Sequence, residues 1–311
     1  MTSQQSQQIP KEFEKDFIPP LQEQDALPGK QWKLDPPPID DITADGKPYK
    51  PAGKLEGRKV IITGGDSGIG RAIALLFALE GADLTVTYLP EEHQDVKDTA
   101  DLIRKKTNDS RKFQFLPADL TKEDVCQAIV QKHLEYFGGQ LDTLICNHGN
   151  QDAVSDITEL DAKHWLDTFD TNLHSFFYLT KAAIPHLEKS PTKQPTIVFN
   201  DSINAFKGHP SLVDYTATKG AILGFARSLN AQLVGKSGIR VNCVAPGPIW
   251  TPLIPPSMTK ESKEQFGLKT TMGRAGQPVE VATCFVFLAS ADSSYISGQT
   301  LHPNGGVVVG S

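Results

Sequence analysis

The chain contains the stretch Val60-Ile61-Ile62-Thr63-Gly64-Gly65-Asp66-Ser67-Gly68-Ile69-Gly70-Arg71, in which a β-branched run is followed by a glycine-rich turn. Beyond the turn, Ala72, Ile73 and Leu76 continue an apolar face at helical spacing, so a strand, a turn and a helix are predicted. Glycines let the backbone approach a pyrophosphate, and the free N–H groups at the helix start attract that anion. The predicted contacts of this turn are Thr63, Gly64, Asp66, Ser67, Gly68, Ile69 and Gly70.

Outward from this stretch, short apolar runs alternate with longer helical stretches from Lys54 onward. Strands that are apolar on both faces and separated by helices indicate a parallel sheet that is covered on both sides. The sequence therefore predicts an α/β fold, a Rossmann-type doubly wound sheet of about seven strands, in a single domain that spans residues 54–311. The predicted strands are residues 59–63, 84–88, 112–116, 141–146, 196–200, 240–244 and a last one near 300–302.

Residues 1–53 have a different character, because they contain nine prolines and little periodicity. Proline fixes φ and removes a backbone donor, so long helices and central strands are excluded there. We expect an N-terminal arm. Its aromatic residues leave two interpretations open, docking onto the body or a neighbouring subunit, and a disordered arm. These aromatic residues are Phe13, Phe17, Trp32 and Tyr49.

Composition excludes several classes of function. A net charge of -6 without a run of basic residues argues against nucleic acid as a partner. No stretch approaches the ~20 apolar residues that span a bilayer, and residues 1–16 contain no apolar signal core, so we expect a cytoplasmic protein without a membrane partner. Four scattered cysteines without C-x-x-C spacing are interpreted as reduced structural thiols, with no metal site. They are Cys126, Cys146, Cys243 and Cys284.

A second motif, Asp214-Tyr215-Thr216-Ala217-Thr218-Lys219, places a tyrosine and a lysine on one face of a predicted helix. A phenol titrates near pH ~10, so a base near neutrality needs a shift of about three units, or ~4 kcal/mol. A lysine cation ~5 Å away contributes about 3 kcal/mol at an effective dielectric of ~20. Alone, the pair also fits a solvated helix surface. With its companions it predicts proton transfer by Tyr215.

The G-x-x-x-G-x-G turn after Thr63, together with Tyr215 and Lys219, resembles the short-chain dehydrogenase/reductase family over about residues 54–308. The arm, G-G-D-S-G-I-G and Y-L-P-E-E are most similar to its glucose/ribitol dehydrogenase-like subgroup. The resemblance implies an NAD(P)-dependent oxidoreductase that interconverts an alcohol or polyol with an aldehyde or ketone. It implies that Tyr215 is the acid/base, that Lys219 lowers the pKa of Tyr215 and holds the nicotinamide ribose, that Ser202 orients substrate, and that Asn172 holds a water of the proton relay.

The resemblance also implies cofactor contacts along the strand ends, with Asp119 and Leu120 near the adenine and the segment after the sixth strand near the nicotinamide amide. The choice between NAD and NADP stays open, because Tyr88-Leu89-Pro90 offers neither an acid nor a base. Glu91 and Glu92 follow too late to be placed. The implied contacts beyond the glycine turn are Tyr88, Asp119, Leu120, Asn147, Gly149, Tyr215, Lys219, Pro246, Gly247, Ile249 and Thr251.

The chain departs from the family pattern in three places. Cys146-Asn147-His148-Gly149 replaces N-N-A-G, and a thiol cannot replace an amide that hydrogen-bonds in two directions. His148 is interpreted as a group that lines the site or as a catalytic group. Asp201 precedes Ser202 where many relatives have a small hydroxyl residue; it either binds backbone donors or disturbs the local electrostatics. His302-Pro303-Asn304-Gly305-Gly306 replaces V-D-G-G, which puts the contacts of the last strand in question.

The substrate pocket is expected to include His148, Gln151, Asn204, Phe206 and the loop of residues 250–273, which is either a lid or a plain surface loop. Two further functional interpretations stay open, a cofactor-binding scaffold with little turnover and a narrow biosynthetic ketoreductase. The resemblance implies a homo-oligomer, a tetramer or a dimer. The apolar run of residues 221–226 is expected at its interface or in the core.

Overall fold

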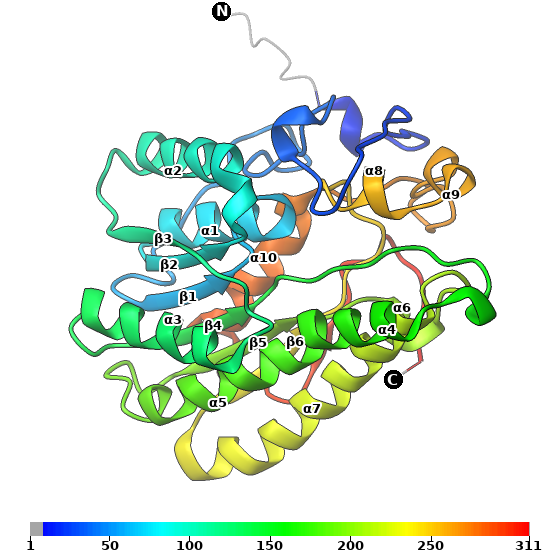
Figure 1. The fold of residues 1–311 in the computed structure, drawn as a ribbon. Helices are drawn as coiled ribbons and strands as arrows, with labels where there is room; N and C mark the ends of the chain where they lie inside the picture. Colours follow the sequence, from blue (N-terminus) through cyan, green and yellow to red (C-terminus); the bar gives the residue numbers. More distant parts are fainter. Residues whose placement is uncertain (1–8, 311) are drawn as a thin grey trace, which may run out of the picture.

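A computed structural model describes residues 9–310 of the chain. Its centre is a seven-stranded sheet in which every neighbouring pair is parallel, in the order β3-β2-β1-β4-β5-β6-β7 (Figure 1). The strands are β1 (Lys59–Thr63), β2 (Asp83–Tyr88), β3 (Phe113–Pro117), β4 (Thr143–Cys146), β5 (Thr196–Asn200), β6 (Arg240–Val244) and β7 (Thr300–Leu301). The predicted Rossmann-type sheet in a single domain is confirmed, and the strand ends differ from prediction by at most two residues, which is ordinary for element boundaries.

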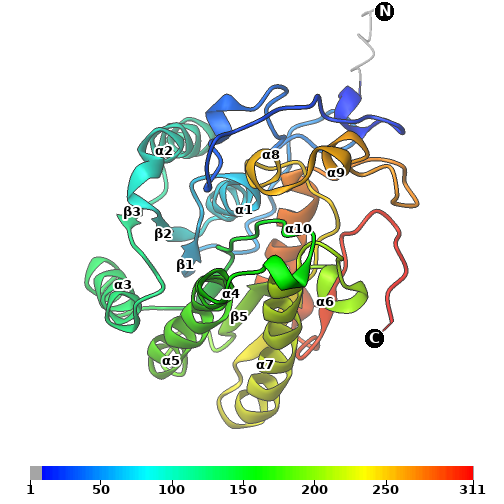
Figure 2. The same ribbon diagram turned by 45° about the vertical axis from the view of Figure 1, so that its right-hand side comes forward.

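Helices cover both faces of this sheet (Figures 1 and 2). One face packs against α1, α2 and α10, and the other packs against α3, α5 and α7. The helices are α1 (Gly68–Leu79), α2 (His93–Thr107), α3 (Glu123–Tyr136), α4 (Ala162–Phe169), α5 (Ser175–Leu187), α6 (Asn204–Lys207), α7 (Val213–Ser237), α8 (Ile254–Ser257), α9 (Lys260–Glu264) and α10 (Pro278–Ala289). A π-helical turn, Asp170–His174, joins α4 to α5. The loops at the carboxyl ends of the strands therefore lie between the two helical layers, where open α/β sheets bind ligands.

The described part of the arm, residues 9–53, lies on the body of the same chain and is drawn in blue in Figure 1. Leu34 is buried in a small apolar cluster with Trp250, Ile254 and Phe266. The indole N–H of Trp250 donates to the carbonyl oxygen of Pro36 at 2.9 Å. Of the arm's aromatic residues, Phe13 is buried, Phe17 and Tyr49 are half-buried and Trp32 is exposed. Of the two interpretations, docking onto the body therefore applies to Phe13, Phe17 and Tyr49, whereas the Trp32 side chain lies in solvent.

Within residues 9–310, no helix is both long enough and apolar enough to cross a membrane. The four cysteines are free thiols, three of them buried. Burial raises the pKa of the Cys146 and Cys243 thiols well above their usual range, so both stay protonated and unreactive at neutral pH. This agrees with their interpretation as structural residues.

Candidate active site

Two cavities open side by side over the carboxyl ends of the strands. We call the first, of about 360 Å³, the turn groove, because the glycine turn after β1 lines it. We call the second, of about 480 Å³, the tyrosine pocket, because Tyr215 and Lys219 line it. Asn147, Gly149 and Thr251 belong to the walls of both, so the two cavities form one continuous site.

The glycine turn takes a shape that side chains would prevent. Gly64 and Gly68 have φ values of 59° and 52°, a left-handed backbone that favours glycine. A Cβ on Gly70 would lie 1.9 Å from the carbonyl oxygen of Gly64. The start of α1 therefore packs directly on the end of β1, and the first N–H groups of the helix lie beside the turn groove.

Asn147 holds this turn from the neighbouring strand. Its Nδ2 donates to the carbonyl oxygens of Thr63 at 3.0 Å and Gly64 at 2.9 Å, and its Oδ1 accepts from Nδ2 of Asn200 at 2.9 Å. The Thr63 hydroxyl accepts from the backbone N–H of Asn147 at 2.9 Å. Cys146 points into the core and takes no part. The side-chain amide of Asn147 thus both donates and accepts hydrogen bonds. The glycine turn forms as expected, although Cys146 stands where the family pattern has an asparagine.

His148 lies in the wall of the turn groove and not in the tyrosine pocket, which corrects its expected place in the substrate pocket. Its Nδ1 lies 2.7 Å from the hydroxyl oxygen of Thr63, and its Nε2 lies 2.8 Å from that of Ser175. Burial, with a smaller effect from the Lys219 cation, lowers the pKa of His148 to about 3. Because the ring stays neutral and both nitrogens are engaged, the structure favours a bracing role over a catalytic one.

Three of the four expected catalytic residues converge on the tyrosine pocket. Tyr215 and Lys219 come from one face of α7, and Ser202 follows β5. All three are buried, and Nζ of Lys219 lies 5.4 Å from the centroid of the Tyr215 ring. The same Nζ donates to the carbonyl oxygen of Asn200 at 2.7 Å, which fixes the cation between α7 and the end of β5.

The pKa of Tyr215 moves in the direction opposite to the one we expected. Burial raises it to about 12, and the Ser202 side chain beside the phenol only partly opposes this. Burial also lowers the pKa of Lys219 to about 8, against the attraction of Asp201. Burial of the phenol is the largest effect on the pKa of Tyr215, because desolvation penalises the charged phenolate, and the Asp201 carboxylate acts in the same direction. The expectation from sequence counted the charges of Lys219 and of the nicotinamide but not burial, so the lowering of the Tyr215 pKa by Lys219 stays a prediction.

Asp201 is buried beside this pair. Neither carboxylate oxygen finds a hydrogen-bond partner within the described residues. Burial raises the pKa of Asp201 to about 7, although Lys219 opposes this. Both interpretations of Asp201 describe it in part, because the backbone N–H of Ser202 lowers its pKa while its carboxylate alters the local electrostatics. Its negative charge further disfavours the Tyr215 phenolate.

Asn172, the fourth expected catalytic residue, lines neither cavity. It lies in the π-helical turn, a feature that is frequent at functional sites. Its Oδ1 accepts from the backbone N–H of Asn150 at 2.7 Å, and its Nδ2 donates to the carbonyl oxygen of Asn150 at 2.8 Å and to the Thr218 hydroxyl at 3.2 Å. The Asn172 side chain therefore clamps the segment after β4 against the residue that precedes Lys219.

The remaining expected contacts divide between the cavities. Thr63 lines neither, because it is fully buried beneath the turn. The expected contacts in the turn groove are Gly64, Asp66, Ser67, Gly68, Ile69, Gly70, Tyr88, Asp119, Leu120, Asn147, Gly149 and Thr251. Those in the tyrosine pocket are Ile69, Asn147, Gly149, Tyr215, Lys219, Pro246, Gly247, Ile249 and Thr251.

Sequence reasoning missed two groups of residues in the turn groove. Glu91 and Glu92 line it, because the short 3-10 turn Pro90–Glu92 directly after β2 turns the chain back toward the sheet edge. A carboxylate oxygen of Glu92 accepts from the backbone N–H of Leu89 at 3.0 Å, and a proline followed by acids is a readable sign of such a turn. Residues 27–29 of the arm also line the groove, and no local pattern marks them.

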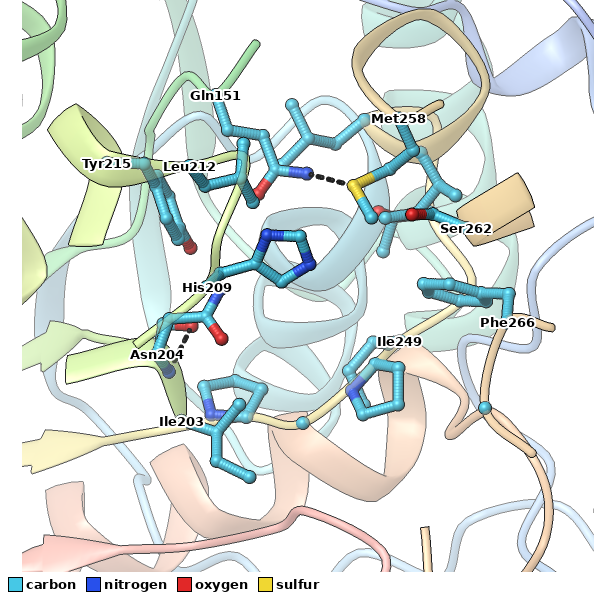
Figure 3. A pocket seen from close by; sticks show the side chains of 18 of the residues that line it. Gln151, Ile203, Asn204, His209, Leu212, Tyr215, Ile249, Met258, Ser262 and Phe266 are labelled. Atoms are coloured by element: carbon cyan, nitrogen blue, oxygen red, sulfur yellow. Dashed lines mark hydrogen bonds between the residues drawn. The ribbon is translucent and has the colours of Figure 1, made fainter. Parts of the chain in front are cut away.

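The far wall of the tyrosine pocket comes from residues 250–273, which form α8, α9 and the turns around them (Figure 3). Gln151, Asn204 and Met258 line the pocket as expected, and Nε2 of Gln151 donates to Sδ of Met258 at 3.5 Å. Phe206 does not line it. Its ring packs against His302 instead, 4.7 Å between centroids.

Comparison with known proteins agrees with this geometry. A family model described as enoyl-(acyl carrier protein) reductase matches residues 64–308. The glucose and ribitol dehydrogenase of Daucus carota is 46% identical over 293 residues, which cover 93% of this chain and 97% of that protein. This chain is a short-chain dehydrogenase/reductase. Membership confirms the resemblance seen in the sequence and makes the protein an NAD(P)-dependent dehydrogenase or reductase.

Other relatives of similar identity have varied names. The NADPH-dependent aldehyde reductase 1, chloroplastic, of Arabidopsis thaliana is 45% identical over 291 residues, covering 93% of this chain and 98% of that protein. General stress protein 39 of Bacillus subtilis is 45% identical over 287 residues, covering 92% of this chain and 96% of that protein. These names leave the substrate of this short-chain dehydrogenase/reductase open.

The turn groove fits the nicotinamide dinucleotide that this family uses. A buried Oδ2 of Asp66 has no hydrogen-bond partner within the described residues, although Asp66 lines the groove. Such an atom is a natural acceptor for a ribose hydroxyl. The missing Cβ of Gly70 lets the start of α1 pack on β1, and this brings the helix N-terminus, whose N–H groups attract a pyrophosphate, to the groove.

Proposed function

We propose that this protein interconverts an alcohol or polyol with an aldehyde or ketone by hydride transfer, with Tyr215 as the acid/base. One observation carries the proposal. Tyr215 and Lys219 from α7 and Ser202 after β5 meet in a buried pocket that is continuous with a groove suited to a dinucleotide. A buried hydroxyl pair beside a cation is suited to hold a carbonyl oxygen and exchange a proton with it.

Within this mechanism each residue has one task. Ser202 and Tyr215 would hold the substrate oxygen, and Tyr215 would give or take its proton. Lys219 would stabilise the phenolate and hold the nicotinamide ribose, and Asn172 would support the relay through the segment it clamps. When bound, the dinucleotide supplies or accepts the hydride. We propose that it is held by the turn-groove contacts named above and by Pro246, Gly247 and Ile249, with Thr63 acting from beneath the turn.

The lining of the tyrosine pocket supports a small hydroxylated substrate. Gln151, Asn204 and Ser262 present polar side chains, while Met258 and Phe266 form an apolar side (Figure 3). Such a pocket can hydrogen-bond the hydroxyls of a polyol or of a sugar-derived carbonyl compound and still cover its carbon chain. The names of relatives that include glucose, ribitol and aldehyde are compatible with this class.

The turn groove supports NAD over NADP. Asp66, Glu91, Glu92 and Asp119 line it, and no lysine or arginine is found among its described lining residues. A 2′-phosphate placed among these four acidic side chains would have one cation nearby, Lys30, whose Nζ already donates to the carbonyl oxygen of Glu91. We expect NADH to bind at least tenfold more tightly than NADPH, as measured by fluorescence titration. Equal affinities would refute this preference.

Activity assays with Tyr215→Phe test the reaction. The wild-type protein and the variant are assayed by absorbance of the reduced nicotinamide against a panel of aldehydes, ketones, sugars and polyols. We expect wild-type turnover that disappears in Tyr215→Phe while NADH still binds. Retained turnover in the variant would refute the role of Tyr215. Binding without turnover in the wild-type protein would favour the scaffold, an alternative supported by the negative charge that Asp201 places beside the phenol.

A homo-oligomer, a tetramer or a dimer, remains part of the proposal. Ile222 and Ala226 of the run 221–226 are buried in the core, so they are not available for an interface. Phe177 on α5 is 44% exposed and lies 6.3 Å from Phe225 on α7, ring to ring, which supports an interface on these two helices. Light scattering tests the assembly, and a monomeric mass would refute it.

A cytoplasmic location also remains part of the proposal, because free thiols are compatible with the reducing cytoplasm.

A further inference from the structure

The arm contributes a segment to the cofactor site that no sequence motif marks. We call residues 27–31, Leu27-Pro28-Gly29-Lys30-Gln31, the arm strap. They contact Asp95 on α2 and Pro252 before α8, and the blue arm that contains them lies near α2 and α8 in Figures 1 and 2. Leu27, Pro28 and Gly29 line the same cavity as Ser67 and Gly68 of the glycine turn. The strap therefore forms part of the wall against which a dinucleotide would lie.

The arm strap is attached to both sides of the groove. On the α2 side, the Asp95 carboxylate accepts from the backbone N–H groups of Gln31 at 3.0 Å and Trp32 at 3.1 Å. Nζ of Lys30 also donates to the carbonyl oxygen of Glu91 at 3.1 Å. On the other side, Gly29 packs closely on the segment before α8. A Cβ on Gly29 would lie 1.9 Å from the carbonyl oxygen of Pro252.

Gln31 reaches the phosphate-binding turn itself. Its buried Oε1 accepts from the backbone N–H of Gly68 at 2.6 Å. This N–H belongs to the first turn of α1, where backbone donors have no partner inside the helix. Nearby, Nε of Arg71 on α1 donates to the Asp40 carboxylate of the arm at 2.8 Å. The arm thus holds the first turn of α1 at two points.

We propose that the arm strap is a structural part of the dinucleotide-binding site, in which residues 27–29 contact the bound dinucleotide and Gln31 fixes the turn that receives its pyrophosphate. The inference rests on the dinucleotide of the proposed function. Because the strap bridges the two sides of the groove, it shields the ligand from water and slows its release. Binding of the dinucleotide against the strap costs little conformational entropy. The backbone of the strap is already held by hydrogen bonds to Asp95 and by close packing on Pro252.

Two variants of the strap and one control test the inference. Gly29→Ala places a Cβ against Pro252 and should displace the strap, and Leu27→Ala removes a side chain from the groove wall. Leu21→Ala is the matched control, because that side chain is on the same arm but is 47% exposed and outside the groove. Kd for NADH is measured by fluorescence titration and the dissociation rate by stopped flow. We expect Kd to rise about tenfold in Gly29→Ala, equivalent to about 1.4 kcal/mol, and about threefold in Leu27→Ala. The control should stay within about twofold of the wild-type value.

A second measurement keeps the inference testable if Gly29→Ala does not fold. In the wild-type protein, hydrogen exchange at the backbone amides of Leu27, Gly29, Lys30 and Gln31 should slow when NADH saturates the site. Unchanged exchange, together with an unchanged Kd in Leu27→Ala, would overturn the role of the strap. A wild-type protein that binds neither NADH nor NADPH would overturn both this inference and the proposed function. Binding that responds to the strap variants without turnover on any substrate would overturn only the reaction.

Discussion

Replacing Lys219 by methionine should weaken the acid/base function of Tyr215 by an amount that the structure allows us to estimate. Nζ of Lys219 lies 5.4 Å from the centroid of the Tyr215 ring. At an effective dielectric of ~20, the attraction between this cation and a phenolate is about 3 kcal/mol. Since one pKa unit corresponds to about 1.4 kcal/mol, the pKa of Tyr215 should rise by about two further units. We therefore expect kcat for alcohol oxidation near pH 7 to fall about 100-fold.

The pH dependence of this loss gives the sharper test. Burial lowers the pKa of Lys219 to about 8, so its charge is present below that pH and is lost above it. The ratio of wild-type to Lys219→Met kcat should consequently be largest below pH 8 and should approach one near pH 10. Lys236→Met, an exposed lysine on the same helix, is the matched control and should leave kcat unchanged.

The assay separates chemistry from binding by measuring kcat from pH 6 to pH 10, together with Kd for NADH. A loss in kcat of the same size at every pH would refute the electrostatic reasoning. It would show that Lys219 acts only by positioning the ribose or the Ser202 segment. A change confined to Kd would lead to the same conclusion.

Three further predictions concern stability and binding. Burial lowers the pKa of His133 to about 4, so the unfolded chain takes up a proton below about pH 6.5 that the folded chain excludes. The contribution of His133 to the unfolding free energy should thus fall by up to about 3 kcal/mol from pH 6.5 to pH 4, measured as the difference between the wild-type protein and His133→Gln in urea titrations at each pH, and a difference that does not change with pH would contradict this. Gly70→Ala should cost about 1–3 kcal/mol and weaken NADH binding more than tenfold, because its Cβ would meet the Gly64 carbonyl oxygen; an unchanged Kd would argue against the tight turn. Leu34→Ala should cost about 2 kcal/mol and raise KM, since Leu34 supports Trp250 and Phe266, and urea unfolding with an unchanged midpoint would contradict this.

Local patterns in the sequence were sufficient for the framework of this protein. The glycine turn, the seven apolar runs and the spacing of Tyr215 and Lys219 are all short-range features, because backbone geometry repeats every two residues in a strand and every 3.6 in a helix. The resemblance to the short-chain family placed Ser202 beside them, at the carboxyl end of a predicted parallel strand. These residues indeed meet in the tyrosine pocket.

Long-range packing governed the rest. The Gln31 side chain meets the Gly68 N–H across a separation of 37 residues, and no periodicity connects them. Phe206 turned away toward His302, and His148 became a neutral brace between Thr63 and Ser175, through contacts with distant elements. The pKa of Tyr215 rose because desolvation depends on every atom that surrounds the phenol, whereas the spacing of two residues along a helix reports only one neighbour.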